Sequence, residues 1–184
     1  MSFSEENEMV ANVNPLNEFS GCHDGIINNF QQLQELISII QKTPDSEEIQ
    51  PRAKKILNFF DDVVLIHHAE EEQELFTLVM ECVEKGPQAD TARAFIKQLV
   101  AEHRQLEAMW KEIEKDLRLL SKGKPANLNH KTAIRLSIEY LAHAEFEEQK
   151  FLPLSAEILS KNDLSALGLS LHMRHQRELP VNYI

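Results

Sequence analysis

The chain is 184 residues long and carries a net charge of −11, from 19 basic and 30 acidic residues. This acidic balance argues against nucleic acids and anionic membrane surfaces as partners, because both attract basic patches. No apolar run approaches the roughly 18–20 residues that a membrane-spanning helix needs, and the acidic N-terminus lacks the features of a secretion signal. A hydrophobic content of 42%, with five glycines and two cysteines, favours an all-α domain in the reducing cytoplasm.

Three turn-forming stretches divide the chain into helical segments. They are Thr43-Pro44-Asp45, Gly86-Pro87 and Gly123-Lys124-Pro125, in which proline and glycine end one helix and begin a connection. The segments span about 16–42, 48–85, 88–121 and 127–160, followed by a shorter helix over 164–179 with Asn162 or Asp163 as its N-cap. This pattern predicts a flexible arm over 1–14, an antiparallel up-down four-helix bundle over 15–160, and a C-terminal helix and tail over 161–184.

Histidines interrupt the apolar stripes of these segments. In the first, third and fourth segments, apolar residues recur at alternating steps of three and four, which is the spacing of a core-facing helix. In each stripe, one position that the pattern assigns to an apolar residue holds a histidine, namely His23, His103 or His143. A single histidine of this kind is usually a hydrogen-bonded core residue, but three of them indicate a common cause.

The second and fourth segments share the pattern His-x-x-x-Glu, with an apolar pair eight and nine residues after the histidine. The motif residues are His67 with Glu71 and His143 with Glu147, and residues four apart lie on the same face of a helix. A carboxylate in a bundle core is unfavourable unless it is paired or bound to a metal. Because carboxylates can bridge two ions, imidazoles and carboxylates that converge from four helices predict a dinuclear metal centre.

Neighbouring residues compete for the inward positions. At about 100° per residue, Glu71 coincides with the apolar face of the second segment, whereas Glu72 lies roughly 100° away from it. His67 lies somewhat closer to this face than His68. On the fourth segment, Glu147 lies within the stripe and the glutamate that follows it lies outside. We therefore expect the two outward glutamates to be dispensable for metal binding.

These motifs resemble a known family, the hemerythrin-like HHE cation-binding domains, across about residues 16–160. The matching parts are Cys22-His23-Asp24-Gly25, HHAEEEQELF from position 67, Glu102-His103-Arg104 with Trp110, and HAEFEEQKFLP from position 143. The resemblance implies a four-helix bundle that holds two non-haem iron ions, with dioxygen or another small diatomic molecule as the partner. Carried over position by position, it implies six ligands: His23, His67, Glu71, His103, His143 and Glu147.

Glu107 marks a departure from the oxygen-carrying members, which have a second histidine one turn after the ligand on the third helix. Extra carboxylate ligation favours the ferric state, so we expect reaction with dioxygen to end in a stable oxidised form. Whether Glu107 or His68 joins the site is left open by the sequence.

The resemblance implies sensing of, or reaction with, oxygen, nitric oxide or iron. The alternatives are a di-iron oxidoreductase that acts on peroxide and a structural bundle that holds zinc or no metal. The sequence contains no Glu-x-x-His pair of the ferritin type, no HExxH motif and no haem attachment motif. The C-terminal helix is partly apolar, so it can cap the bundle or form a homodimer.

Overall fold

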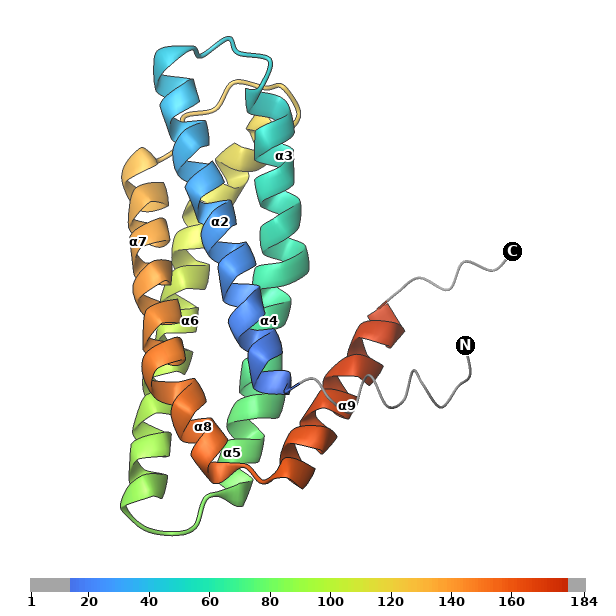
Figure 1. Ribbon diagram of the computed structural model, residues 1–184. Helices are drawn as coiled ribbons and strands as arrows, with labels where there is room; N and C mark the ends of the chain where they lie inside the picture. Colours follow the sequence, from blue (N-terminus) through green and yellow to red (C-terminus); the bar gives the residue numbers. More distant parts are fainter. Residues whose placement is uncertain (1–13, 179–184) are drawn as a thin grey trace, which may run out of the picture.

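The computed structural model describes residues 14–178 and folds them into four long helices with a fifth beside them (Figure 1). The first long helix is α2 (Pro15–Lys42), and the third is α6 (Pro87–Leu120). The second and fourth contain π-helical turns (η): α3 (Ile49–Phe59), η1 (Phe60–Val64), α4 (Leu65–Glu70), η2 (Glu71–Leu75) and α5 (Phe76–Cys82), then α7 (His130–Phe146), η3 (Glu147–Phe151) and α8 (Leu152–Ile158). The fifth helix is α9 (Lys161–Glu178). The predicted all-α class is confirmed, whereas residues 1–13 of the predicted arm and 179–184 of the tail lie outside the described residues.

The helix ends follow local signals in the sequence. Asn14 caps α2, because its side chain accepts a hydrogen bond from the backbone N–H two residues later. Asn129 caps α7 in a similar way, by accepting from the backbone N–H of Thr132. Gly86 precedes α6 with φ at 146°, a backbone conformation that favours glycine. The predicted connection before the third long helix therefore depends on that glycine.

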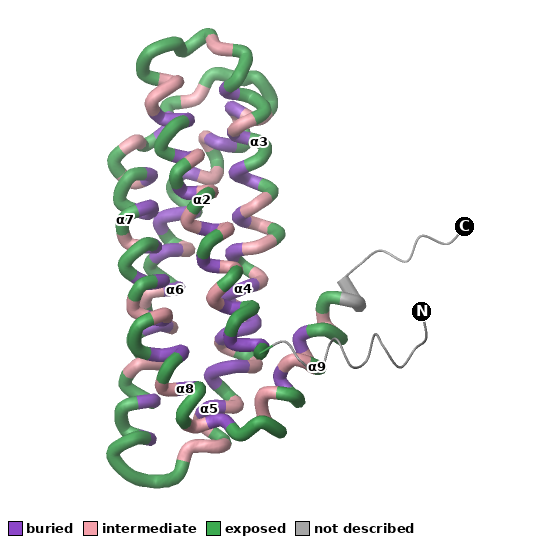
Figure 2. The backbone as a smooth tube through the Cα atoms, in the orientation of Figure 1, coloured by how far each residue is buried: buried purple, intermediate pink, exposed green. Residues whose placement is uncertain are grey.

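Two apolar clusters fill the bundle, one on each side of a layer of buried histidines and glutamates near its middle, here called the polar layer. One lies toward the α2–α3 connection and includes Phe60 and Trp110, whose rings stack with centroids 3.8 Å apart. The other lies toward the α5–α6 connection and includes Leu75 and Phe151. In Figure 2 buried stretches of the backbone, in purple, recur along the length of the bundle. Each large apolar side chain buried in this way contributes about 1.5–3 kcal/mol, which offsets the unfavourable burial of the polar layer.

The C-terminal helix α9 begins at Lys161 and packs against α2 and η2 (Figure 1). The hydroxyl of Ser160 accepts from the backbone N–H of Asp163, whose carboxylate accepts from the backbone N–H of Ser160. This reciprocal pair is a capping box, so the N-cap is Ser160 and the predicted assignment to Asn162 or Asp163 is wrong. Farther along α9, His175 lies 2.8 Å from a carboxylate oxygen of Glu70.

Some apolar side chains remain on the outside of the bundle. On α7 they include Ile138, which is 57% exposed, and on α9 they include Leu169, which is 56% exposed. Homodimer formation through α9 stays a prediction. Among residues 14–178, no helix combines the length and the apolar character needed to cross a membrane.

Candidate metal centre

A layer of buried ionisable side chains crosses the middle of the bundle, and all four long helices contribute to it. Each member is at most 2% exposed. The members are His23 on α2, His67 and His68 on α4, Glu71 on η2, His103 on α6, His143 on α7 and Glu147 on η3. The structure therefore brings together the six residues that the sequence indicates and adds His68 to them.

Both glutamates of the layer stand at the first position of a π-helical turn. The backbone carbonyl of Glu71 accepts from the N–H of Phe76, and that of Glu147 accepts from the N–H of Leu152, five residues later in each case. A π turn inserts one extra residue into an α-helix and is frequent at functional sites. Each π turn shifts the helical register after its glutamate. Both residues of the apolar pair that follows are buried, Leu75 with Phe76 and Phe151 with Leu152.

The carboxylate of Glu71 lies between histidines of two different helices. Its Oε1 lies 3.1 Å from Nε2 of His67, and its Oε2 lies 3.3 Å from Nε2 of His103. One carboxylate thus faces α4 and α6 at the same time.

Glu147 has the corresponding place between α2 and α7. Its Oε2 lies 2.9 Å from Nε2 of His23 and 3.7 Å from Nε2 of His143. The potential ligand atoms form two groups of four, in each of which all atoms lie within 4.8 Å of one another. Both groups contain Glu71 and Glu147, so the two carboxylates are common to them.

The inner atoms of the layer have no hydrogen-bond partner among the described residues. This holds for Nε2 of all five histidines and for all four oxygens of the two glutamates. A buried polar atom without a partner costs about 1–3 kcal/mol, and more when it is charged. Imidazole nitrogens and carboxylate oxygens that face one another without hydrogen bonds fit a transition-metal ion, because that ion accepts electron pairs from both.

Outer carboxylates support four of the five imidazoles from behind. Measured from Nδ1 to the nearest carboxylate oxygen, the pairs are His23 with Glu148 at 2.8 Å, His103 with Glu72 at 2.8 Å, His143 with Glu102 at 2.9 Å and His68 with Glu107 at 3.4 Å. An acceptor behind Nδ1 holds the N–H there and directs the lone pair of Nε2 to the centre, as in histidines that bind metals. Arg104 pairs with both Glu72 and Glu107 and balances their charge.

Burial also sets the protonation of the layer. Desolvation holds the pKa of His67 well below its ordinary value, and the neighbouring His23 lowers this pKa further. Desolvation likewise lowers the pKa of His103, so both imidazoles are neutral at pH 7, the form that binds metals. Burial, followed by the charge of Glu147, raises the pKa of Glu71 well above its usual range. For Glu147, burial is again the largest single influence and raises the pKa, but the close contact with His23 and the charges of His143 and His23 together outweigh burial and lower the pKa.

The structure offers His68 to the centre in place of Glu107. The ring of His68 stacks on that of His103 with centroids 4.0 Å apart, and one ligand atom of His68 lies within 4.8 Å of those of His103 and His143. Glu107 lies behind His68 and belongs to none of the cation-sized groups found among the described residues. Which of the two residues joins the site stays a prediction, and this geometry favours His68, whose donor atom is a nitrogen from α4.

The sequence did not indicate the supporting role of Glu72 and Glu148. The helical register puts both outside the apolar stripe, and their side chains are 21% and 37% exposed. Each nevertheless reaches a histidine on another helix. A signal was present, because each directly follows an inward-facing glutamate. We therefore revise the expectation that replacing them leaves metal binding unchanged.

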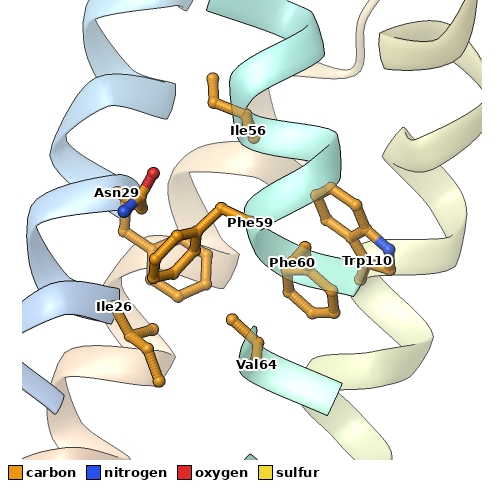
Figure 3. A pocket seen from close by; sticks show the side chains of 8 residues that line it. Ile26, Asn29, Ile56, Phe59, Phe60, Val64 and Trp110 are labelled. Carbon is orange, nitrogen blue, oxygen red and sulfur yellow. The ribbon is translucent and has the colours of Figure 1, made fainter. Parts of the chain in front are cut away.

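An apolar pocket lies one helical turn away from the polar layer, between α2 and the α3–η1 part of the second helix (Figure 3). Ile26 and Val64 line it, and each is three residues from a histidine of the layer, His23 or His67. Phe60, on the same turn as Val64, and Trp110 on α6 also line it. An uncharged recess therefore lies one helical turn from the layer on this side of the bundle.

Comparison with known families decides what this arrangement is. The family model of the hemerythrin HHE cation binding domain matches residues 14–155, a range that contains the whole polar layer. The chain belongs to this family. An uncharacterized protein of Haemophilus influenzae is similar to it, with 24% identity over 162 residues, which are 88% of this chain and 90% of that protein.

Membership of the hemerythrin HHE family confirms the resemblance that the motifs indicate. It makes the chain a cation-binding protein, and the buried layer supplies donor groups that can hold a metal. The donors come from every long helix of the hemerythrin HHE bundle, so binding a cation would tie the four helices together.

Proposed function

We propose that this hemerythrin HHE domain holds two iron ions in its polar layer. One ion would take His23 and His67, the other would take His68, His103 and His143, and both would share Glu71 and Glu147. The observation that carries the proposal is that the same two carboxylates belong to both four-residue groups. A single ion has no need of shared donors, whereas two neighbouring ions are held together by them.

The donor set favours iron over other cations. Imidazole nitrogens suit zinc, copper, iron and nickel better than magnesium or calcium, and carboxylates suit the harder of these ions. Two divalent ions bring four positive charges, of which Glu71 and Glu147 neutralise two. The outer carboxylates behind the imidazoles offset the remainder through the Nδ1 hydrogen bonds. A doubly charged pair of ions is thereby stabilised inside an apolar bundle.

We further propose that the centre binds a small diatomic molecule, dioxygen or nitric oxide. Aromatic rings close the layer, with Phe19 centred 6.0 Å from His67 and Phe76 centred 6.1 Å from His103. Only a ligand of a few atoms can enter such a layer, and the apolar recess beside it suits an uncharged molecule. Iron bound there would supply ligand coordination and one-electron redox chemistry. The chain supplies neutral imidazoles, shared carboxylates and an apolar wall that excludes water.

Both cysteines, Cys22 and Cys82, are free thiols that are partly buried. Burial, followed by the charge of nearby Glu70, raises the pKa of the Cys22 thiol, which disfavours its reactive thiolate form. Free thiols are typical of a reducing compartment, and we propose the cytoplasm as the site of action.

Titration of the reduced protein with nitric oxide tests this function. Protein loaded anaerobically with Fe(II) should bind nitric oxide with new visible absorption bands, and the Glu71→Ala/Glu147→Ala double variant should not. A parallel sample exposed to dioxygen and then degassed separates reversible binding from oxidation. Iron-loaded protein that binds neither gas contradicts the proposal, and rapid turnover of peroxide by that protein would favour the oxidoreductase alternative.

A further inference from the structure

Tyr140 borders the polar layer and carries a hydroxyl group that has no partner among the described residues. Tyr140 precedes His143 by three residues on α7, so their side chains share a face of the helix. Its side chain is 0% exposed, and its ring centroid lies 5.5 Å from that of His143 and 6.1 Å from that of His68. Among the described residues, no group forms a hydrogen bond with the Tyr140 hydroxyl.

Packing explains the ring of Tyr140 but not its hydroxyl. The ring lies 4.8 Å from that of Phe30, within the apolar cluster on the α2–α3 side of the layer. Phenylalanine would fill this space equally well and would avoid a buried hydroxyl without a partner, which is unfavourable. Buried tyrosines normally place the O–H group against an acceptor. The hydroxyl is therefore free to donate to a molecule bound in the layer.

The hydroxyl is suited to donate a hydrogen bond. The ordinary pKa of a tyrosine phenol is about 10, so the group is protonated at pH 7 and can act as a donor. Four of the five imidazoles direct Nδ1 to an outer glutamate, so their N–H groups are not available to a ligand in the centre.

We propose that the Tyr140 hydroxyl donates a hydrogen bond to the small ligand bound at the centre and so determines which ligands are held there. This inference rests on the proposed function, because it requires a ligand at an iron centre. Ligands that carry negative charge or gain it from the metal accept such a bond most strongly. Tyr140 thus favours ligands with a good acceptor atom over those without one.

Azide binding to the iron-loaded, oxidised protein tests this role. Tyr140→Phe keeps the ring and removes only the hydroxyl. We expect its azide dissociation constant, measured by absorption titration, to rise about tenfold, with iron content unchanged. The metal-free variant should resist urea at least as well as the metal-free parent, because the lost hydroxyl had no partner among residues 14–178.

Ser137→Ala is the matched control. Ser137 is buried one turn before Tyr140 on α7, and its hydroxyl donates to the backbone carbonyl of Ala133. Its removal should leave azide binding unchanged. An azide dissociation constant in Tyr140→Phe within twofold of the parent value would overturn the proposal. So would an intense visible band of the parent that Tyr140→Phe lacks before azide is added, because Tyr140 would then be a metal ligand. Failure of the parent itself to bind iron would overturn the proposed function and this inference with it.

Discussion

Replacing Glu72 tests whether the outer carboxylates tune metal binding. Glu72 Oε1 lies 2.8 Å from Nδ1 of His103, and the Glu72 side chain is 21% exposed, so it orients the ring without belonging to the inner groups. Glu72→Gln keeps the shape and an acceptor oxygen but removes the charge. A hydrogen bond to a charged group contributes about 1.5–3 kcal/mol and a neutral one about 0.5–1.5 kcal/mol. The difference of about 1–1.5 kcal/mol corresponds to a loss in affinity of roughly tenfold.

Glu72→Ala removes the acceptor as well, so its loss in affinity should approach about a hundredfold. The Fe(II) dissociation constant is measured anaerobically by competition with a coloured chelator. Glu114→Gln is the control, because Glu114 is 27% exposed and pairs with Arg118, much as Glu72 pairs with Arg104. The reasoning is refuted if Glu72→Gln binds Fe(II) as tightly as the parent protein, or if Glu114→Gln weakens binding to the same extent.

Four further variants probe the inner layer. Glu71→Ala and Glu147→Ala should each release both ions, because each carboxylate belongs to both donor groups, and a variant that retains one ion by elemental analysis contradicts the sharing. His68→Phe keeps the stacking on His103 and should weaken one ion while leaving the other, whereas two ions at parental affinity would remove His68 from the centre. In metal-free protein, Glu71→Gln should stabilise the fold increasingly as pH rises. The pKa of Glu71 is raised in the folded protein. The parent therefore keeps its full stability below about pH 4.3, the pKa of this carboxyl in the unfolded chain, and loses stability as the pH rises above that value. Urea unfolding at pH about 4.5 and about 7.5 measures this, and an equal effect at both values contradicts it.

The helices and the inward-facing glutamates could be predicted from the sequence because their signals are local. Apolar spacing and the stretch at Gly86-Pro87 define segments whose ends agree with the helices to within a few residues. Glu71 and Glu147 coincide with the apolar faces of their helices, and the structure buries both. The N-cap of α9 was misjudged because Asp163 is the third helical residue of a capping box that begins at Ser160.

The position of His68 could not be predicted from an ideal helical period. The segment that carries it lies between two π-helical turns, η1 and η2, and each shifts the register by one residue. His67 and His68 are therefore both buried although they are adjacent in sequence. The hydrogen bonds from Glu72 and Glu148 to histidines depend on the spacing between helices, which a single helix does not encode.

The metal content of the purified protein tests the central claim most directly. The full chain is expressed in iron-supplemented medium, and iron and zinc are measured by mass spectrometry against the protein concentration. Neutral imidazoles combined with shared carboxylates predict about two irons per chain and little zinc. The Glu71→Ala/Glu147→Ala double variant, purified in parallel, should contain neither metal. Stoichiometric zinc, or no metal in the parent protein after growth in iron, would contradict the di-iron account.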